Sequence, residues 1–117
     1  MRTLGIDLAI TGTHKAVVVD EQGNAIGSVI RFRTDPAELA TLLRRAREGA
    51  DEDEPLRVVM EPTGLAWLPV ASYFIQRGVT VYLVNTQQVS DLRKFYSKHA
   101  GSDRISARVL ARLPSSQ

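Results

Sequence analysis

Leu4-Gly5-Ile6-Asp7-Leu8-Ala9 is an apolar run with a single carboxylate near its middle. A segment this apolar is typical of a central β-strand whose two faces are both covered. Asp7 is unusual there, because aspartate is depleted in strands and an unpaired charge is costly to desolvate. Something must therefore compensate for the carboxylate. We expect a divalent metal ion, and the alternative is hydrogen bonding to loop amides near Thr11–Thr13.

The bulk composition describes one globular domain spanning residues 1–117, with 44% hydrophobic and 24% charged residues. The chain has no cysteine, which excludes disulfides and thiolate metal sites, and its two histidines, His14 and His99, lie too far apart in sequence to suggest a zinc site. No apolar run reaches the roughly 18 residues of a membrane span. Asp7 also stands where a signal peptide would be apolar, so we expect a cytoplasmic protein.

The net charge of +2 is distributed unevenly. The residues from Asn85 onward include six basic and two acidic ones, a net charge of +4, so the residues before Asn85 have a net charge of −2. A basic C-terminal third suits a polyanionic partner such as DNA, and the alternative is a solvated helical face. The residues that we expect to bind nucleic acid are Arg93, Lys94, Lys98, Arg104, Arg108 and Arg112.

Hydrophobic periodicity and turn residues predict an alternation of strands and helices. Asp35, Pro36 and Glu38 have the spacing of a helix N-terminus, and Gly49 ends that helix. The predicted strands are Arg2–Ala9, Lys15–Asp20, Ala25–Phe32, Leu56–Glu61 and Val79–Val84. The predicted helices are 35–48, Ala66–Arg77, Thr86–Phe95 and Asp103–Leu113.

Three antiparallel strands followed by two helix–strand units predict a mixed five-stranded sheet with flanking helices. This is the ribonuclease-H-like α/β arrangement, with the first strand central beside the fourth. Asp7 would then lie next to Glu61, at the sheet edge where the sites of α/β proteins usually form. Two carboxylates this close favour a hard cation between them, such as Mg²⁺ or Mn²⁺. The alternative for Glu61 is that it only ends a strand and caps a helix.

Asp103 is the third candidate acid, at the start of the predicted last helix. A first-turn acid also stabilises a helix dipole without any further function. Arg104, Arg108 and Arg112 recur every four residues on that helix, and such a stripe could hold phosphates or simply face solvent.

Three segments together resemble the N-terminal RuvC-like domain of the DEDD transposases. They are Gly5-Ile6-Asp7, Glu61-Pro62-Thr63-Gly64 with Val84-Asn85, and Ser102-Asp103-Arg104-Ile105-Ser106-Ala107-Arg108. That family includes the pilin-gene inverting recombinase and the bridge-RNA-guided insertion-sequence recombinases. The resemblance implies DNA as partner, a guide RNA in some members, homo-oligomers of the full-length protein, and four acids that bind divalent metal for DNA recombination. By position, the metal ligands would be Asp7, Glu61 and Asp103, and the fourth catalytic position falls on Ser106.

Two features depart from the family pattern. Ser106 stands where a fourth acid is expected, and its neutral hydroxyl is a weak ligand for a hard dication, so we expect weak Mg²⁺ or Mn²⁺ binding. The family's further domain with a serine nucleophile is not in this sequence, and we expect no strand exchange by this chain alone. One alternative is a non-catalytic nucleic-acid-binding module on the same fold. Another is a sugar-kinase-like nucleotide-binding half, although Leu8-Ala9-Ile10 fills the place of its glycine-containing phosphate loop.

Overall fold

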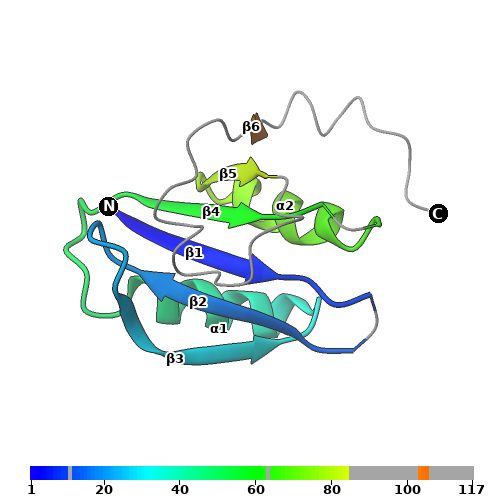
Figure 1. The fold of residues 1–117 in the computed structure, drawn as a ribbon, viewed down its shortest axis with the longest axis horizontal. Helices are drawn as coiled ribbons and strands as arrows, with labels where there is room; N and C mark the ends of the chain where they lie inside the picture. Colours follow the sequence, from blue (N-terminus) through cyan, green and yellow to red (C-terminus); the bar gives the residue numbers. More distant parts are fainter. Residues whose placement is uncertain (11, 63, 85–102, 106–117) are drawn as a thin grey trace.

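A computed structural model describes residues 1–10, 12–62, 64–84 and 103–105 of the chain. Its core is a six-stranded sheet in the order β3-β2-β1-β4-β5-β6 (Figure 1). The elements are β1 (Arg2–Asp7), β2 (His14–Val19), β3 (Ala25–Phe32), α1 (Pro36–Arg47), β4 (Leu56–Met60), α2 (Trp67–Gln76), β5 (Thr80–Leu83) and β6 (Asp103–Ile105).

The five predicted strands and their order are confirmed. β1 pairs antiparallel with β2 and parallel with β4, β2 pairs antiparallel with β3, and β4 pairs parallel with β5. β1 is therefore an interior strand, as its apolar sequence predicted, and the sheet has the mixed ribonuclease-H-like topology. A tight turn joins β2 and β3, with the Asp20 carboxylate accepting from the backbone N–H groups of Gln22 and Asn24.

β3 contains an irregularity that shifts its pairing with β2. Val18 pairs with Ile26, but Ala16 pairs with Ile30. Val17 therefore faces three residues of β3, two more than a regular ladder would place there. Gly27 lies in this bulge with φ of +77°, a conformation that glycine adopts far more readily than residues with a Cβ atom.

α1 begins as the sequence predicted. The Asp35 carboxylate accepts from the Glu38 N–H at 3.1 Å, and the Glu38 carboxylate accepts from the Arg33 N–H at 2.8 Å. Pro36 occupies the first turn, where its missing N–H costs nothing. These contacts fix the point at which the chain leaves β3 and turns back across the sheet.

The other end of α1 is held by Arg2 from β1. Its Nη1 donates to the carbonyl oxygens of Ala46 at 3.1 Å and Glu48 at 2.7 Å. These carbonyls lie at the helix terminus, where intrahelical N–H partners run out. The guanidinium also lies in the negative end of the helix dipole, so Arg2 ties the first strand to the end of the helix that covers it.

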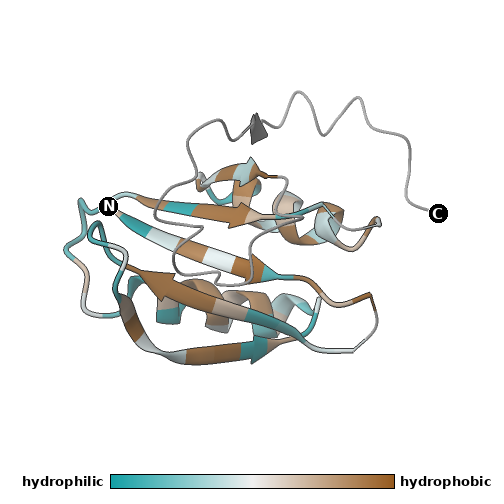
Figure 2. Cartoon of the chain, viewed as in Figure 1, coloured by the Kyte–Doolittle hydropathy of each residue, from teal (hydrophilic) through white to brown (hydrophobic). Residues whose placement is uncertain are grey.

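Both helices cover one face of the sheet, behind the strands in Figure 1. The main core lies between this face of the sheet and the two helices. The strands that line it are rich in hydrophobic residues (Figure 2). Trp67 and Phe74 of α2 are buried in this core, and Tyr73 packs against it. The buried core residues are Leu4, Ile6, Ala16, Val18, Ile30, Phe32, Leu39, Leu42, Ala46, Leu56, Val58, Met60, Trp67, Val70, Ala71, Phe74, Val79 and Val81.

The alternate residues of the strands form the second face of the sheet. Val17, Val19, Val59 and Val84 make a smaller buried cluster there, with Tyr82 packed against it. Because side chains alternate along a strand, Asp7 belongs to this second face, whereas its neighbour Ile6 belongs to the helix-covered face.

The prediction of a helix over Asp103–Leu113 is wrong at its start. Asp103–Ile105 form β6, which pairs antiparallel with β5. Ser102 and Asp103 carry a local helix-start signal, but β5 would otherwise present an unpaired edge, and β6 satisfies its backbone groups. Residues 106–113 and the predicted helix Thr86–Phe95 lie outside the described residues.

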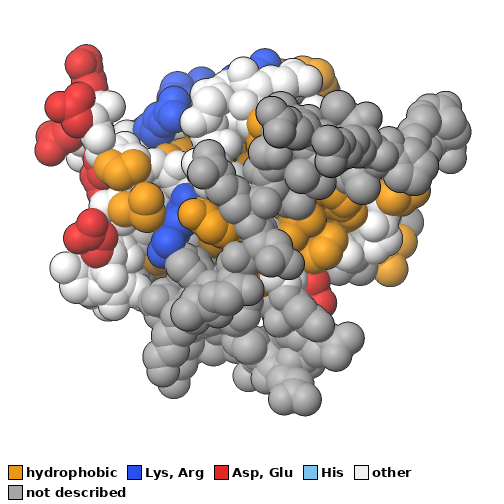
Figure 3. Space-filling view, turned by 90° about the horizontal axis from the view of Figure 1, so that it is seen from above, with side chains coloured by type: hydrophobic (Ala, Val, Ile, Leu, Met, Phe, Trp, Pro, Cys, Tyr) orange, Lys and Arg blue, Asp and Glu red, His pale blue; other side chains and the backbone are white. Residues whose placement is uncertain are grey.

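The acidic run 51–54 lies in the loop before β4. Acidic side chains gather at that end of the molecule in Figure 3. No helix in the described part of the chain is long and apolar enough to cross a membrane.

Candidate metal centre at the ends of β1 and β4

Asp7 and Glu61 lie side by side at one end of the sheet. Asp7 is the last residue of β1, and Glu61 directly follows β4. The register pairs Ile6 with Met60, so the two acids occupy the next level of two parallel strands, whose backbones are about 4.8 Å apart. The register therefore places the two acids at neighbouring backbone positions, and the convergence of their carboxylates on an ion stays a prediction.

The surroundings of the two acids permit ligand binding. Asp7 is exposed and Glu61 is partly exposed. No hydrogen bond or ion pair joins the Asp7 carboxylate to any described residue, so the alternative of loop amides gains no support from Gly12 and Thr13, the described residues of that loop. Two adjacent carboxylates are oxygen donors of the type that Mg²⁺ and Mn²⁺ prefer.

Asp103 lies at the same end of the sheet but farther away. Its backbone pairs with Leu83, which in turn pairs with Met60. Two strand spacings, about 10 Å, therefore separate the backbones at Asp103 and Met60. Among the side chains that the structure describes, no three His, Cys, Asp or Glu residues gather as a metal site.

The other predicted site residues are only partly covered by the structure. Arg104 lies in β6, where its backbone pairs with Tyr82. Outside the described residues lie Ser106, Arg93, Lys94, Lys98, Arg108 and Arg112. Their roles as fourth catalytic position and nucleic-acid contacts stay predictions.

His14 supports the loop that follows Asp7, a role that the sequence did not predict. The residue is 4% exposed, and the centroid of its ring lies 5.2 Å from the centroid of the Phe32 ring. Nδ1 accepts from the Ala9 N–H at 3.0 Å, which assigns the proton to Nε2 and makes Nε2 the donor to Thr34 Oγ1 at 2.8 Å. Burial lowers the pKa of His14 below 6.5, and the Asp7 charge opposes this only in part. The neutral ring therefore anchors the chain two residues beyond Asp7.

A sequence signal for His14 did exist. His14 alternates in phase with Ala16 and Val18, which face the main core, so its position favours a buried side chain. Its partners Ala9 and Thr34 come from other parts of the chain, and no local pattern identifies them.

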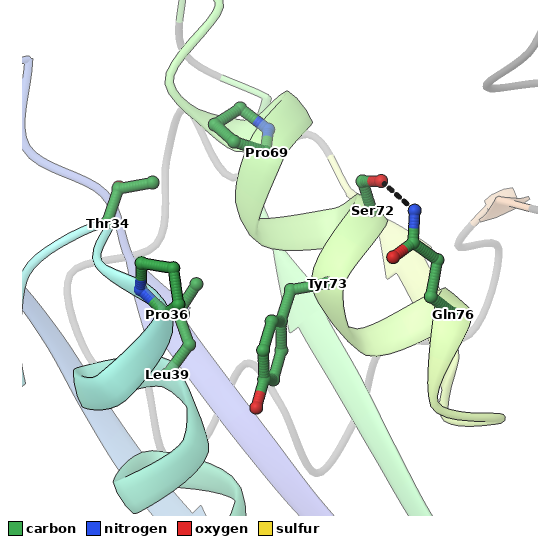
Figure 4. A pocket seen from close by; sticks show the side chains of 7 residues that line it. All are labelled: Thr34, Pro36, Leu39, Pro69, Ser72, Tyr73 and Gln76. Atoms are coloured by element: carbon green, nitrogen blue, oxygen red, sulfur yellow. Dashed lines mark hydrogen bonds between the residues drawn. The ribbon is translucent and has the colours of Figure 1, made fainter.

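A shallow groove of about 380 Å³ lies between the two helices (Figure 4). Tyr73 projects into the space between them, and Ser72 accepts from the Gln76 amide at 3.2 Å. The lining residues are Thr34, Pro36, Leu39, Pro69, Ser72, Tyr73 and Gln76. None of them is charged, so this groove lacks the groups that would bind metal or phosphate.

Comparison with known proteins agrees with the topology of the sheet. Neither curated proteins nor solved structures gave a match. The sequence model of one family, the DEDD transposases of the IS110 type, matches residues 4–116. Because this match covers nearly all of the sequence, the chain belongs to the DEDD transposases of the IS110 type.

Proposed function

We propose that this chain is the metal-binding catalytic domain of a DNA transposase, with Asp7 and Glu61 as two of its metal ligands. The observation that carries the proposal is the position of the two acids, at the same level of adjacent parallel strands and at the end where both strands terminate. Membership of a transposase family implies DNA as the substrate. It also leaves no basis for the sugar-kinase alternative, and the Ala9 N–H in the segment concerned is donated to His14.

Each residue has a specific part in this proposal. Asp7 and Glu61 would hold a Mg²⁺ or Mn²⁺ ion from two strands, and Asp103 would complete the set from the neighbouring edge of the sheet. A bound divalent ion activates the attacking nucleophile and stabilises the leaving oxygen in phosphodiester chemistry. His14 positions the loop after Asp7 and would not serve as a metal ligand, because both ring nitrogens are engaged in other hydrogen bonds.

The second candidate is a non-catalytic nucleic-acid-binding module. One observation favours it: the fourth family position is Ser106, whose hydroxyl contributes no charge to the site. The two candidates differ in whether nucleic-acid function requires metal.

Calorimetric titration of Mn²⁺ and Mg²⁺ tests the proposal. We expect weak binding by the wild-type chain, loss of binding in Asp7→Asn, and markedly tighter binding in Ser106→Asp, because a carboxylate replaces a neutral ligand. Asp53→Asn is the matched control, since it removes an exposed carboxylate in the loop before β4, at the opposite end of that strand from Glu61. Asp7→Asn should leave the free energy of unfolding within about 0.5 kcal/mol of wild type, because Asp7 has no described partner to lose.

Three results would contradict the proposal. Unchanged metal affinity in Asp7→Asn would exclude Asp7 as a ligand, and equal affinities of wild type and Ser106→Asp would remove position 106 from the site. Metal-independent DNA binding together with no metal affinity in any variant would establish the non-catalytic module instead.

A further inference from the structure

The strand register places two basic residues in one row with the paired acids. Lys15 on β2 is the cross-strand partner of Asp7, and Arg31 on β3 is the partner of Lys15. Directly paired residues project from the same face of a sheet. Across the strands, the row consists of Arg31, Lys15, Asp7 and Glu61. On the second face, two basic residues therefore lie next to two acidic ones.

Both cations are available to a ligand. Lys15 and Arg31 are exposed, and neither forms a hydrogen bond or ion pair with any residue that the structure describes. The simplest alternative is that Lys15 only neutralises Asp7 across the strands. That role would bring the ammonium to within 4.0 Å of the carboxylate, and no such contact exists. It would also not account for the exposed Arg31, which lies one strand farther from Asp7.

Among the described residues, the side of the sheet that carries these cations ends in an exposed strand. β3 is the last strand of the sheet, and Ser28 and Val29 on it are exposed. At the opposite side β5 is flanked by β6. A long ligand that reaches the acids along this row therefore crosses the exposed edge at β3 first.

We propose that Lys15 and Arg31 bind the phosphate backbone of the DNA strand whose scissile phosphodiester lies at the Asp7–Glu61 pair. This inference rests on the proposed function and adds a phosphate-binding track to it. Neighbouring strands lie about 4.8 Å apart, and successive phosphates of one DNA strand advance by about 3.4 Å along the helix axis. Two extended basic side chains at this spacing can therefore contact consecutive phosphates. They also offset the repulsion between DNA and the carboxylates.

The test is DNA affinity as a function of salt, measured by fluorescence anisotropy with a labelled duplex and the full chain. The double variant Lys15→Gln/Arg31→Gln should reduce the magnitude of the negative slope of log K against log[salt] by about 2, one unit for each lost phosphate contact. It should also weaken DNA binding at least tenfold. Arg44→Gln/Arg45→Gln is the matched control, because it removes two exposed charges from α1, on the other face of the sheet. We expect its affinity and slope to stay at wild-type values.

A charge-conserving variant serves as a control that separates loss of charge from misfolding. Lys15→Arg/Arg31→Lys should bind DNA within about twofold of wild type, because phosphate contacts by these residues depend mainly on charge. Wild-type affinity in the Gln double variant would overturn the inference. Equal losses in that variant and in the α1 control would also overturn it, because binding would then follow total charge and not this row.

The inference and the proposed function can fail separately. If the Gln double variant keeps wild-type DNA affinity while Asp7→Asn loses Mn²⁺ binding, the phosphate track is wrong and the metal site stands. If Asp7→Asn keeps Mn²⁺ binding while the Gln double variant loses DNA affinity, the metal site is wrong and the cationic row remains a nucleic-acid surface.

Discussion

The charged groups at the two ends of β1 differ in whether they have partners among the described residues. At the start of the strand, the Met1 amino group donates to Glu21 at 2.7 Å and lies 3.5 Å from Glu54. Arg2 beside it binds two helix carbonyls. At the other end, Asp7 lies opposite Lys15 without an ion pair among the described residues.

This difference separates stability from function along a single strand. Paired charges at the start of β1 hold the first strand, α1 and the loop before β4 together. At its other end, charges without a partner among the described residues contribute little to folding, and we propose that they bind an ion and phosphate. Functional sites commonly accept such locally unfavourable charge, because the ligand supplies the missing partner. Substitutions at the two ends should therefore have different consequences.

Arg2→Ala should have the largest effect on folding. The substitution removes a buried guanidinium and leaves the carbonyls of Ala46 and Glu48 without that donor. Hydrogen bonds from a charged donor contribute about 1.5–3 kcal/mol, and we expect the free energy of unfolding to fall by about 2–4 kcal/mol. Urea denaturation followed by circular dichroism measures the change.

Two companions to Arg2→Ala sharpen this result. Arg2→Lys keeps the charge but lacks the planar fork, so it should recover only part of the lost stability. Arg44→Ala, at an exposed position of α1, should change stability by less than about 0.5 kcal/mol. If Arg2→Ala were as mild as Arg44→Ala, the start of β1 would not be the stabilising end.

His14 should produce a smaller, pH-dependent effect at the functional end. Burial holds the pKa of His14 below 6.5, so the ring stays neutral in the folded chain while the unfolded chain takes up a proton. Stability should therefore be highest above pH 6.5 and fall as the pH drops through 6.5 toward the lower folded pKa. Protonation would also remove the acceptor for the Ala9 N–H.

Denaturation curves between pH 7.5 and pH 5 check this prediction for His14. His14→Gln retains an acceptor but does not titrate, so it should flatten the pH dependence in this range. His99→Gln removes the other histidine of the chain and should leave the dependence in place. A wild-type pH profile in His14→Gln would show that another group is responsible.

Glu21→Gln should have the smallest effect, although it breaks the shortest ion pair of the described residues. Both partners are exposed, and water screens such pairs effectively. The hydrogen bond from Met1 to Glu21 raises the pKa of the amino group above 8.0, and that pKa should return toward 8.0 in the variant. NMR titration measures the pKa, and denaturation should show no change in stability beyond experimental error.

Much of the fold follows from local sequence signals. Hydrophobic periodicity and turn residues predicted the antiparallel strands, and Asp35 with Glu38 predicted the start of α1. The adjacency of Asp7 and Glu61 followed from one further step, that strands joined by a helical crossover run parallel.

The features that sequence reasoning missed depend on contacts between distant segments. Arg2 reaches α1 more than forty positions later in the chain, and His14 reaches Thr34. Asp103 carries a local helix signal, but it lies in a strand because β5 offers an open edge. The row of Lys15 and Arg31 was likewise hidden, because it depends on the register of two strand pairs.

The bulge in β3 determines which residue completes that row. If the pairing of Val18 with Ile26 continued without interruption, Val29 would stand opposite Lys15, and Arg31 would lie beyond the ladder. The bulge shifts the register of β3 by two residues. Because this number is even, each side chain of β3 keeps its face of the sheet, but Arg31 takes the place of Val29 opposite Lys15. A glycine with a left-handed backbone, carrying no charge of its own, thereby determines the electrostatic character of a surface four residues away.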